Sequence, residues 1–421
     1  MNSDQEKMQV LLVESTYFPQ MIAKTLPQIL ESIPSNFAVT LFTSQECYEF
    51  IPLSLKLKLK KIHKFENFYS NPLVEFKTNI FLKENPSAYV IALREFDLLR
   101  VSRSCLNNNN KSFNYPSIFN YRDKIHMKQK LKDKEIPVAK YRPVQSATCL
   151  LQASYELGFP FIVKPRCKAA GIGFKVLNCE NDIVNYLDSL KNDLDWDEDL
   201  NLIAEEYIGT EMFHVDGFVK DGKIIFSLAS RYLGHKPHLA WDPKTATNIL
   251  SGSICVKRNT DEYIALMEIT QKSLHALGNS QHCFAFHAEI WKRNNNYLIN
   301  EIACRIGGGQ VMIMFTETLT YSPEKFLIAE ILQIKNPPLL PNIDENEITL
   351  IARLLPKKGL IASSQLNLPP NCQIQLQVPE GEKLNHPQKW YDAFAYLTIK
   401  SHSEEAAKDC YWEIYNIIYH K

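Results

Sequence analysis

The residues best suited to chemistry are two glutamates in apolar surroundings, Glu289 and Glu301, twelve positions apart. Each lies in an apolar segment typical of a strand, and the asparagines at 294–296 favour a tight turn between the segments. Strand pairing would place the two carboxylates side by side, where they repel unless a cation lies between them. Carboxylate oxygens suit Mg²⁺ held jointly with substrate phosphates. We therefore predict a Mg²⁺ (or Mn²⁺) site here, with solvated acids on a surface hairpin as the plainer alternative.

Arg305 lies four residues beyond Glu301 and precedes three glycines at 307–309. Its guanidinium could hold a carboxylate or a phosphoryl oxygen. The glycines would let the backbone turn sharply beside it. We therefore expect Arg305 to contact the reacting group.

A second candidate is a lysine at the end of an apolar segment, followed by a loop of small residues. Lys164 ends the segment 159–165, and Gly171 and Gly173 lie in the loop that follows. Such glycines let backbone amides approach phosphate oxygens, and the ammonium neutralises charge. This indicates triphosphate binding, although an ordinary glycine hairpin is the commoner origin of an isolated motif of this kind.

The segment from Ala204 to Glu211 is apolar at its start and acidic at its end. It could simply be an exposed strand end. In a nucleotide-binding interpretation, backbone groups of Glu206 and Ile208 contact adenine, and the Glu211 carboxylate contacts the ribose hydroxyls. Both interpretations stay open at this point.

The overall composition excludes several classes of protein. A chain of 421 residues with 45% hydrophobic and 22% charged residues is typical of a globular protein of two to four packed units. Lys+Arg and Asp+Glu both number 47, which argues against a nucleic-acid partner. The ten cysteines include no Cys-x-x-Cys pair and indicate free thiols in a reducing compartment. Because no apolar run is long enough for a signal peptide or a membrane span, we expect a cytoplasmic protein without membrane contact.

Several elements must position these residues. Apolar runs and turn signals predict strands at 10–13, 37–42, 88–93, 159–165, 174–177, 201–208 and 348–354, and hairpins at 212–229 and 284–302. Helices are predicted at 19–32, 121–134 and 404–418, and the asparagines at 107–110 are predicted as a loop. No glycine-rich phosphate loop follows the first strand, which argues against a dinucleotide site there.

In their order along the chain, these motifs resemble the ATP-grasp superfamily, especially its biotin-carboxylase-like and L-amino-acid ligase branch. The matching stretches are Asp123-Lys124, 136–138, 158–164, the glycine loop, 205–208, Glu211, Glu289 and 300–305. The resemblance implies an α/β and α+β fold. It implies a Rossmann-like domain at 1–114, an ATP-grasp core at 115–335 with a lid subdomain at about 140–204, and a small C-terminal domain at 336–421.

The resemblance also implies roles for individual residues. The expected nucleotide contacts are Lys124, Lys164, Lys168, Ala170, Gly171, Gly173, Glu205, Glu206, Tyr207, Ile208, Glu211 and His287. Glu289 and Glu301 are the expected metal ligands. Arg305, Lys164 and Arg231 are the expected catalytic residues. His287 resembles a histidine of amino-acid ligases, but a lone histidine is more often structural.

Two departures from the family pattern stand out. The family often has asparagine two residues after the second metal acid, where this chain has Ala303. One oxygen ligand is therefore missing. The lid carries Arg166, Cys167 and Lys168 where serine and glycine are usual, which alters the lid backbone and adds positive charge.

The implied function is an ATP-dependent ligase that joins a carboxylate to an amine through an acyl phosphate and releases ADP and phosphate. A biotin-carboxylase-like activation of bicarbonate and a non-catalytic nucleotide-binding module are the alternatives. The expected partners are ATP and a small carboxylate and amine, and the resemblance is compatible with a homodimer. The substrate pocket would be built from the N-terminal domain, 231–241 and 307–314, which carry no readable specificity.

Overall fold

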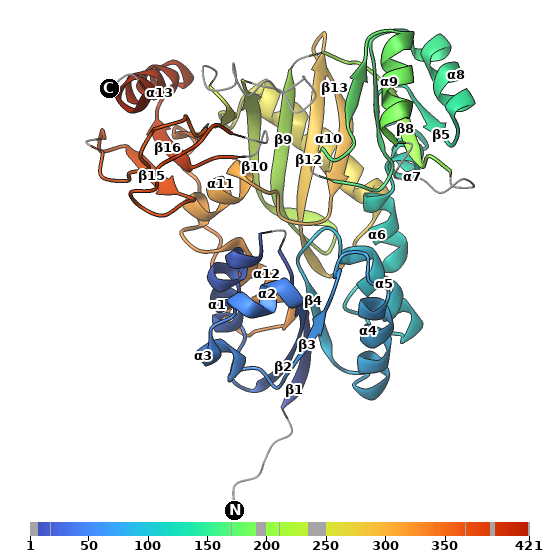
Figure 1. The fold of residues 1–421 in the computed structure, drawn as a ribbon, viewed down its shortest axis with the longest axis vertical. Coiled ribbons are helices and arrows are strands. Elements are labelled where there is room, and N and C mark those ends of the chain that lie inside the picture. Colours follow the sequence, from blue (N-terminus) through green and yellow to red (C-terminus); the bar gives the residue numbers. More distant parts are fainter. Residues whose placement is uncertain are drawn as a thin grey trace, which may run out of the picture.

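The computed structural model describes residues 7–16, 18–169, 171–190, 199–209, 211–234, 250–366, 368–387 and 392–419. Its strands form three sheets, one of eight strands and two of four. In Figure 1 the N-terminal sheet lies at the bottom, the large sheet lies above it, and the other small sheet lies at the upper right. Among the described residues, no helix combines the length and apolar character needed to cross a membrane.

The N-terminal domain is a parallel sheet with helices on both faces (Figure 1). Its strands are β1 (Met8–Val13), β2 (Phe37–Ser44), β3 (Lys61–Phe65) and β4 (Tyr89–Ala92), in the order β3-β2-β1-β4. One face is covered by η1 (Pro19–Met21), α1 (Ile22–Glu31), α2 (Gln45–Phe50) and α3 (Leu53–Lys56), and the other by α4 (Leu73–Glu84) and α5 (Leu98–Asn107).

The first strand shows why its sequence is continuously apolar. Leu11 and Val13 pack into the core on one face of the sheet, and Val10 and Leu12 pack into the core on the other. A strand buried on both faces has no polar positions to alternate with. The Rossmann-like layer order expected from the sequence is therefore observed.

The second small sheet is antiparallel and lies between Tyr141 and Glu206. Its strands are β5 (Tyr141–Val144), β6 (Phe161–Pro165), β7 (Lys175–Leu177) and β8 (Leu202–Glu206), in the order β5-β8-β6-β7. Its helices are α8 (Ala147–Leu157) and α9 (Glu180–Leu190). Lys164 of β6 pairs with Ile203 of β8, two residues before Glu205, so the Lys164 and Glu205 side chains lie on the same face of the sheet and two charged groups of the candidate site are brought together.

The large sheet is antiparallel and has the order β13-β12-β9-β10-β11-β14-β16-β15. Its strands are β9 (Met212–Lys220), β10 (Lys223–Leu233), β11 (Gly252–Cys255), β12 (Cys283–Arg293), β13 (Asn296–Ala303), β14 (Ile348–Leu354), β15 (Cys372–Leu376) and β16 (Ala395–Ser401). The remaining helices are α6 (Tyr115–Arg122), α7 (Lys124–Lys132), α10 (Asp261–Leu277), α11 (Gln310–Leu319), α12 (Pro323–Ile331) and α13 (Glu404–Tyr419). Because β14 pairs with β11, the strands beyond residue 336 continue the sheet of the core.

Two predicted elements differ from the structure. The single helix expected at 121–134 is two helices, because Asp123 is extended (φ −97°, ψ 107°) and caps α7 by accepting from the His126 amide at 2.9 Å. The asparagines expected as a loop at 107–110 include the end of α5. Asn110 is buried and donates to the Ala88 carbonyl at 2.9 Å.

Candidate active site

The two predicted metal acids face each other across neighbouring strands. Glu289 of β12 and Glu301 of β13 are cross-strand partners, as expected from the sequence. Asn300 donates from Nδ2 to Glu289 Oε2 at 2.8 Å, and the Tyr232 hydroxyl donates to Glu289 Oε1 at 3.3 Å. The side chains of Glu289 and Glu301 are 17% and 29% exposed, so both carboxylates stay accessible while their positions are restrained.

Two lysines from separate elements compensate the charge of Glu301. Lys124 Nζ, at the start of α7, lies 3.2 Å from Glu301 Oε2, and Lys164 Nζ, on β6, lies 4.0 Å from the same oxygen. Burial alone would raise the pKa of Glu301, but these two ammonium groups outweigh it and hold that pKa at about 2. Both lysines were expected at phosphates, and here they converge on one carboxylate.

Glu205 was expected at adenine, but its carboxylate is buried between two lysines. Lys164 Nζ lies 3.0 Å from Oε2, and Lys128 Nζ lies 3.3 Å from Oε1. Burial raises the pKa of Glu205, and the two lysines overcome it and lower that pKa. The Glu205 side chain therefore fixes Lys164 in the site. Sequence analysis missed Lys128, although it lies one helical turn after Lys124 and so on the same face of α7.

The other residues expected to contact the nucleotide lie at the end of β8 and just beyond it in the chain. The Glu206 carboxylate accepts from the Lys140 amide at 2.8 Å and lies 3.2 Å from Arg293 Nη1. Ile208 packs with Met212, Trp291 and Leu298, and Tyr207 lies beside it in the chain. Glu211 is 42% exposed and lies 3.8 Å from Arg231. Their nucleotide roles stay predictions.

The glycine loop has the backbone expected of it. Gly171 and Gly173 have φ of +68° and +74°, and a Cβ at Gly173 would lie 2.7 Å from the Pro165 ring. Lys124 Nζ donates to the Lys168 carbonyl at 2.7 Å, which ties the start of the loop to the site. Ala170, also expected to contact nucleotide, lies outside the described residues.

The two arginines expected to be catalytic are both paired with acids. Arg305 donates from Nε to Glu95 Oε2 at 2.5 Å, and Arg122 pairs with the other oxygen of Glu95. Burial raises the pKa of Glu95, but the two guanidinium groups outweigh it and hold that pKa at about 2. Glu95 follows β4, so this link joins the N-terminal domain to the site. Arg231 pairs with Glu404 at the start of α13 and lies 3.8 Å from Glu211.

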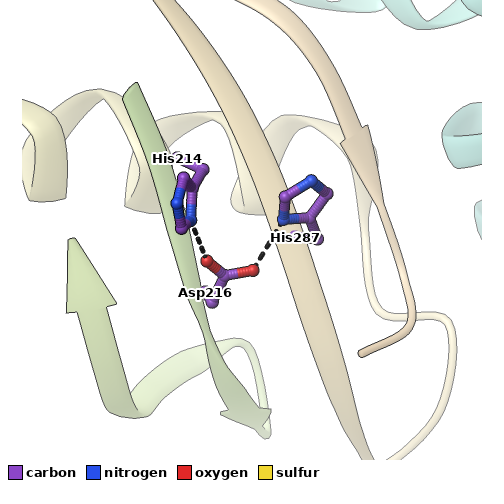
Figure 2. Close-up of side chains that lie close together, drawn as sticks. All are labelled: His214, Asp216 and His287. Carbon is purple, nitrogen blue, oxygen red and sulfur yellow. Dashed lines mark hydrogen bonds and ion pairs between the residues drawn. The ribbon is translucent and has the colours of Figure 1, made fainter. Parts of the chain in front are cut away.

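A third feature of the site was not predicted: a chain of hydrogen bonds through His214, Asp216 and His287 (Figure 2). Asp216 Oδ2 lies 2.5 Å from His214 Nδ1, and Oδ1 lies 2.6 Å from His287 Nδ1. His214 Nε2 meets Ser253 Oγ at 2.8 Å. Burial alone would lower the pKa of His287, but the Asp216 and Glu289 carboxylates outweigh it and raise it to about 10.

The sequence carried a signal for this chain of hydrogen bonds. The strand predicted at the start of the first hairpin has His214 and Asp216 at alternate positions, between Phe213, Val215 and Phe218. Both polar side chains are buried. A histidine and an aspartate on the inward face of an otherwise apolar strand require buried partners, although the sequence does not say which residues these are.

Known proteins resemble parts of the chain in sequence. No protein-family model matches the chain. It is 31% identical over 210 residues to the L-arginine-specific L-amino acid ligase of Bacillus subtilis, covering 48% of this chain and 47% of that protein. It is 28% identical over 159 residues to the D-alanine–D-alanine ligase of Pseudomonas putida, covering 37% and 46%. The chain thus spans about half the length of the curated relatives it matches.

Similar solved structures extend over nearly the whole chain. The L-amino acid ligase from Bacillus licheniformis has a TM-score of 0.68 at 14% identity, covering 97% of this chain and 96% of that one. The carboxyaminoimidazole ribonucleotide synthase from Aspergillus clavatus, solved with ATP, has a TM-score of 0.66 at 16% identity, covering 98% and 99%. These likenesses show that the chain has the ATP-grasp fold.

Proposed function

We propose that the chain is an ADP-forming ligase that activates a carboxylate with ATP as an acyl phosphate and passes it to an amine. The observation that carries the proposal is the convergence of Glu289, Glu301, Lys124 and Lys164 where the two antiparallel sheets meet. Acids that face each other beside cations suit a polyphosphate and its metal ion. The names of the curated relatives support an amino acid among the substrates.

The donor set fits a hard dication. The carboxylates of Glu289 and Glu301 lie on adjacent strands and remain accessible, and they would hold Mg²⁺. When bound, Mg²⁺ neutralises phosphate charge and stabilises the leaving ADP. ATP itself is supported by the neighbours that were solved with it or with ADP.

The chain's own residues supply position and charge. Lys124 and Lys164 place ammonium groups beside the phosphates, and Glu205 holds Lys164 in that position. Arg305, held by Glu95, would meet the acyl phosphate and stabilise its developing negative charge. Because Glu95 belongs to the N-terminal domain, that domain helps to orient the group on which the reaction depends. A homodimer and a cytoplasmic location remain predictions.

The test is ADP and phosphate release by the full chain with Mg-ATP across a panel of carboxylic acids and amines. We expect turnover that needs one acid and one amine and disappears in Glu301→Gln. Glu268→Gln is the matched control, because this glutamate is 64% exposed on α10 and pairs only loosely with Lys272, at 3.9 Å. Release of AMP and pyrophosphate would contradict the proposal, and turnover with bicarbonate alone would favour the carboxylase alternative.

A further inference from the structure

The inference concerns the orientation of His287 beside the candidate metal acids. A carboxylate only accepts hydrogen bonds, so both histidine Nδ1 atoms that contact Asp216 must carry protons. With Nδ1 directed at Asp216, the Nε2 atom of His287 points the opposite way, toward Glu289 (Figure 2 shows the ring and its contact with Asp216). The buried carboxylate of Asp216 therefore sets the orientation of the His287 ring.

The distance between His287 Nε2 and Glu289 Oε1 is 3.6 Å. That is too long for a hydrogen bond. It does fit two ligands of one ion, because atoms that each lie about 2.1 Å from an ion are at most about 4.2 Å apart. The same two atoms could thus share a dication without moving the strand.

The register of the sheet places His287 beside a position that bears on metal binding. Its cross-strand partner is Ala303, two residues beyond Glu301. That is the position where the superfamily often has an asparagine oxygen as a metal ligand, and alanine offers none. His287 lies directly across from the missing ligand.

Resting on the proposed function, we propose that His287 Nε2 gives up its proton to solvent when the dication binds and becomes a third protein ligand of the ion held by Glu289 and Glu301, with Asp216 and His214 as positioning residues. Metal-bound histidines almost always donate their other ring N–H to a carboxylate or carbonyl, which is the contact that Asp216 makes. A nitrogen ligand favours transition-metal dications over Mg²⁺. The site should therefore prefer Mn²⁺ or Co²⁺ to Mg²⁺ more strongly than an all-oxygen site.

The three residues in Figure 2 could be mistaken for a metal site of their own, since their ligand atoms lie within 4.8 Å of one another. The individual distances argue against that. Adjacent ligands around an octahedral ion at about 2.1 Å are about 3.0 Å apart, whereas Asp216 lies 2.5 and 2.6 Å from the two nitrogens. These are hydrogen-bond distances, so the cation belongs on the Nε2 side of His287.

The test uses Mn²⁺ and ADP with the full chain, prepared with ordinary or ¹⁵N-labelled histidine, and measures electron spin-echo modulation of the bound Mn²⁺. We expect a directly bound ¹⁴N signal that changes with the label, which adenine nitrogens cannot cause. His287→Asn should keep Mn²⁺ bound through an oxygen, lose the signal and lower the ratio of Mn²⁺ to Mg²⁺ affinity about tenfold. Asp216→Asn should weaken Mn²⁺ binding about 10- to 100-fold.

The matched control is His282→Asn. His282 pairs with Asp221 at 2.8 Å, but it is 54% exposed at the far end of β9 and β12, so the signal should not change. Mn²⁺ binding that depends on Glu301 but shows no histidine nitrogen, or a signal that survives in His287→Asn, would overturn the inference and leave the proposed ligase intact. Absence of any Mn²⁺ binding to the wild-type chain would overturn the metal site of both.

Discussion

Two halves of one face of the large sheet differ in character, because one is polar and the other is apolar. Where β9 carries His214 and Asp216, the face is polar, and His287 links it to Glu289, one of the two candidate metal acids. Two residues further on, Phe218 packs against Phe315 and Phe326, with ring centroids 5.5 and 4.6 Å away. The same strand therefore carries a buried polar cluster at one end and apolar core residues at the other. The difference depends on what packs against the face: α11 and α12 cover the apolar half, while in the polar half the buried His214 and Asp216 hydrogen-bond to each other and to His287.

The largest expected effect comes from the polar half. Glu301→Gln keeps the shape of the side chain but removes one charge between Lys124 and Lys164. We expect turnover to fall at least about ten-thousandfold, which corresponds to a rise of more than about 5 kcal/mol in the activation barrier. The reason is that the metal ion would lose one ligand and the phosphates would lose the charge of the metal ion. Steady-state kinetics measure it, with thermal unfolding as the check on folding. Activity within tenfold of the wild type would show that the polar half is not the site.

The apolar half should respond in stability instead. Phe218→Ala removes a fully buried ring from contact with Phe226, Phe315 and Phe326. We expect the free energy of unfolding to fall by about 3–5 kcal/mol, from lost burial and the cavity left behind. Chemical denaturation measures it. The folded fraction should keep its turnover per molecule, and a selective loss of turnover would blur the division between the halves.

Where the two halves meet, Arg305 and Ile306 are neighbours in the chain. Arg305 bonds to Glu95, while Ile306 belongs to the apolar cluster. Burial raises the pKa of Glu95, but Arg122 and Arg305 outweigh it, so that the folded pKa is about 2 against an ordinary 4.5. A lowered pKa gives stability that is fully present above pH 4.5 and is lost as the pH falls toward 2.

The expected loss between pH 5 and pH 2.5 is about 2 kcal/mol in the free energy of unfolding, which is most of the contribution that a shift from 4.5 to about 2 makes. Denaturation curves at pH 5 and pH 2.5 measure it, and Glu95→Gln should reduce the difference by about that amount. Glu75→Gln is the control, because its pair with Arg103 is 29–45% exposed. An equal pH response in wild type and Glu95→Gln would remove Glu95 as the cause.

Many of the strands and hairpins behind this contrast could be predicted from the sequence, but the side-chain partners within the site could not. The hairpins, the first strand and the pairing of Glu289 with Glu301 followed from alternation and turn signals. The helix predicted at 121–134 missed the break at Asp123, because no proline or glycine interrupts the sequence there. The strands β3, β5, β11, β15 and β16 were also missed, although all of them contribute to sheets.

The partners of Glu205, Asp216 and Arg305 could not be predicted, because they depend on contacts between distant segments. Glu205 meets Lys128 across 77 positions of sequence (205 − 128), and Arg305 meets Glu95 across 210. Local patterns show that a residue is polar and inside a strand. Only the strand register shows which other polar residue faces it, and that decides between a solvated acid and a positioning residue.

The smallest expected effect concerns an exposed aspartate–histidine pair that belongs to neither half and serves as a comparison for the buried pair. The strands that carry Asp216 and His287 also lead to a second aspartate–histidine pair, Asp221 with His282, whose side chains are 70% and 54% exposed. Water solvates both partners there, so His282→Asn should change the free energy of unfolding by less than about 0.5 kcal/mol and leave turnover unchanged. Chemical denaturation and steady-state kinetics check it beside Asp216→Asn. Since the two pairs share residue types and strands, a large effect at His282 would mean that burial is not what separates them, and the role assigned to Asp216 would lose its basis.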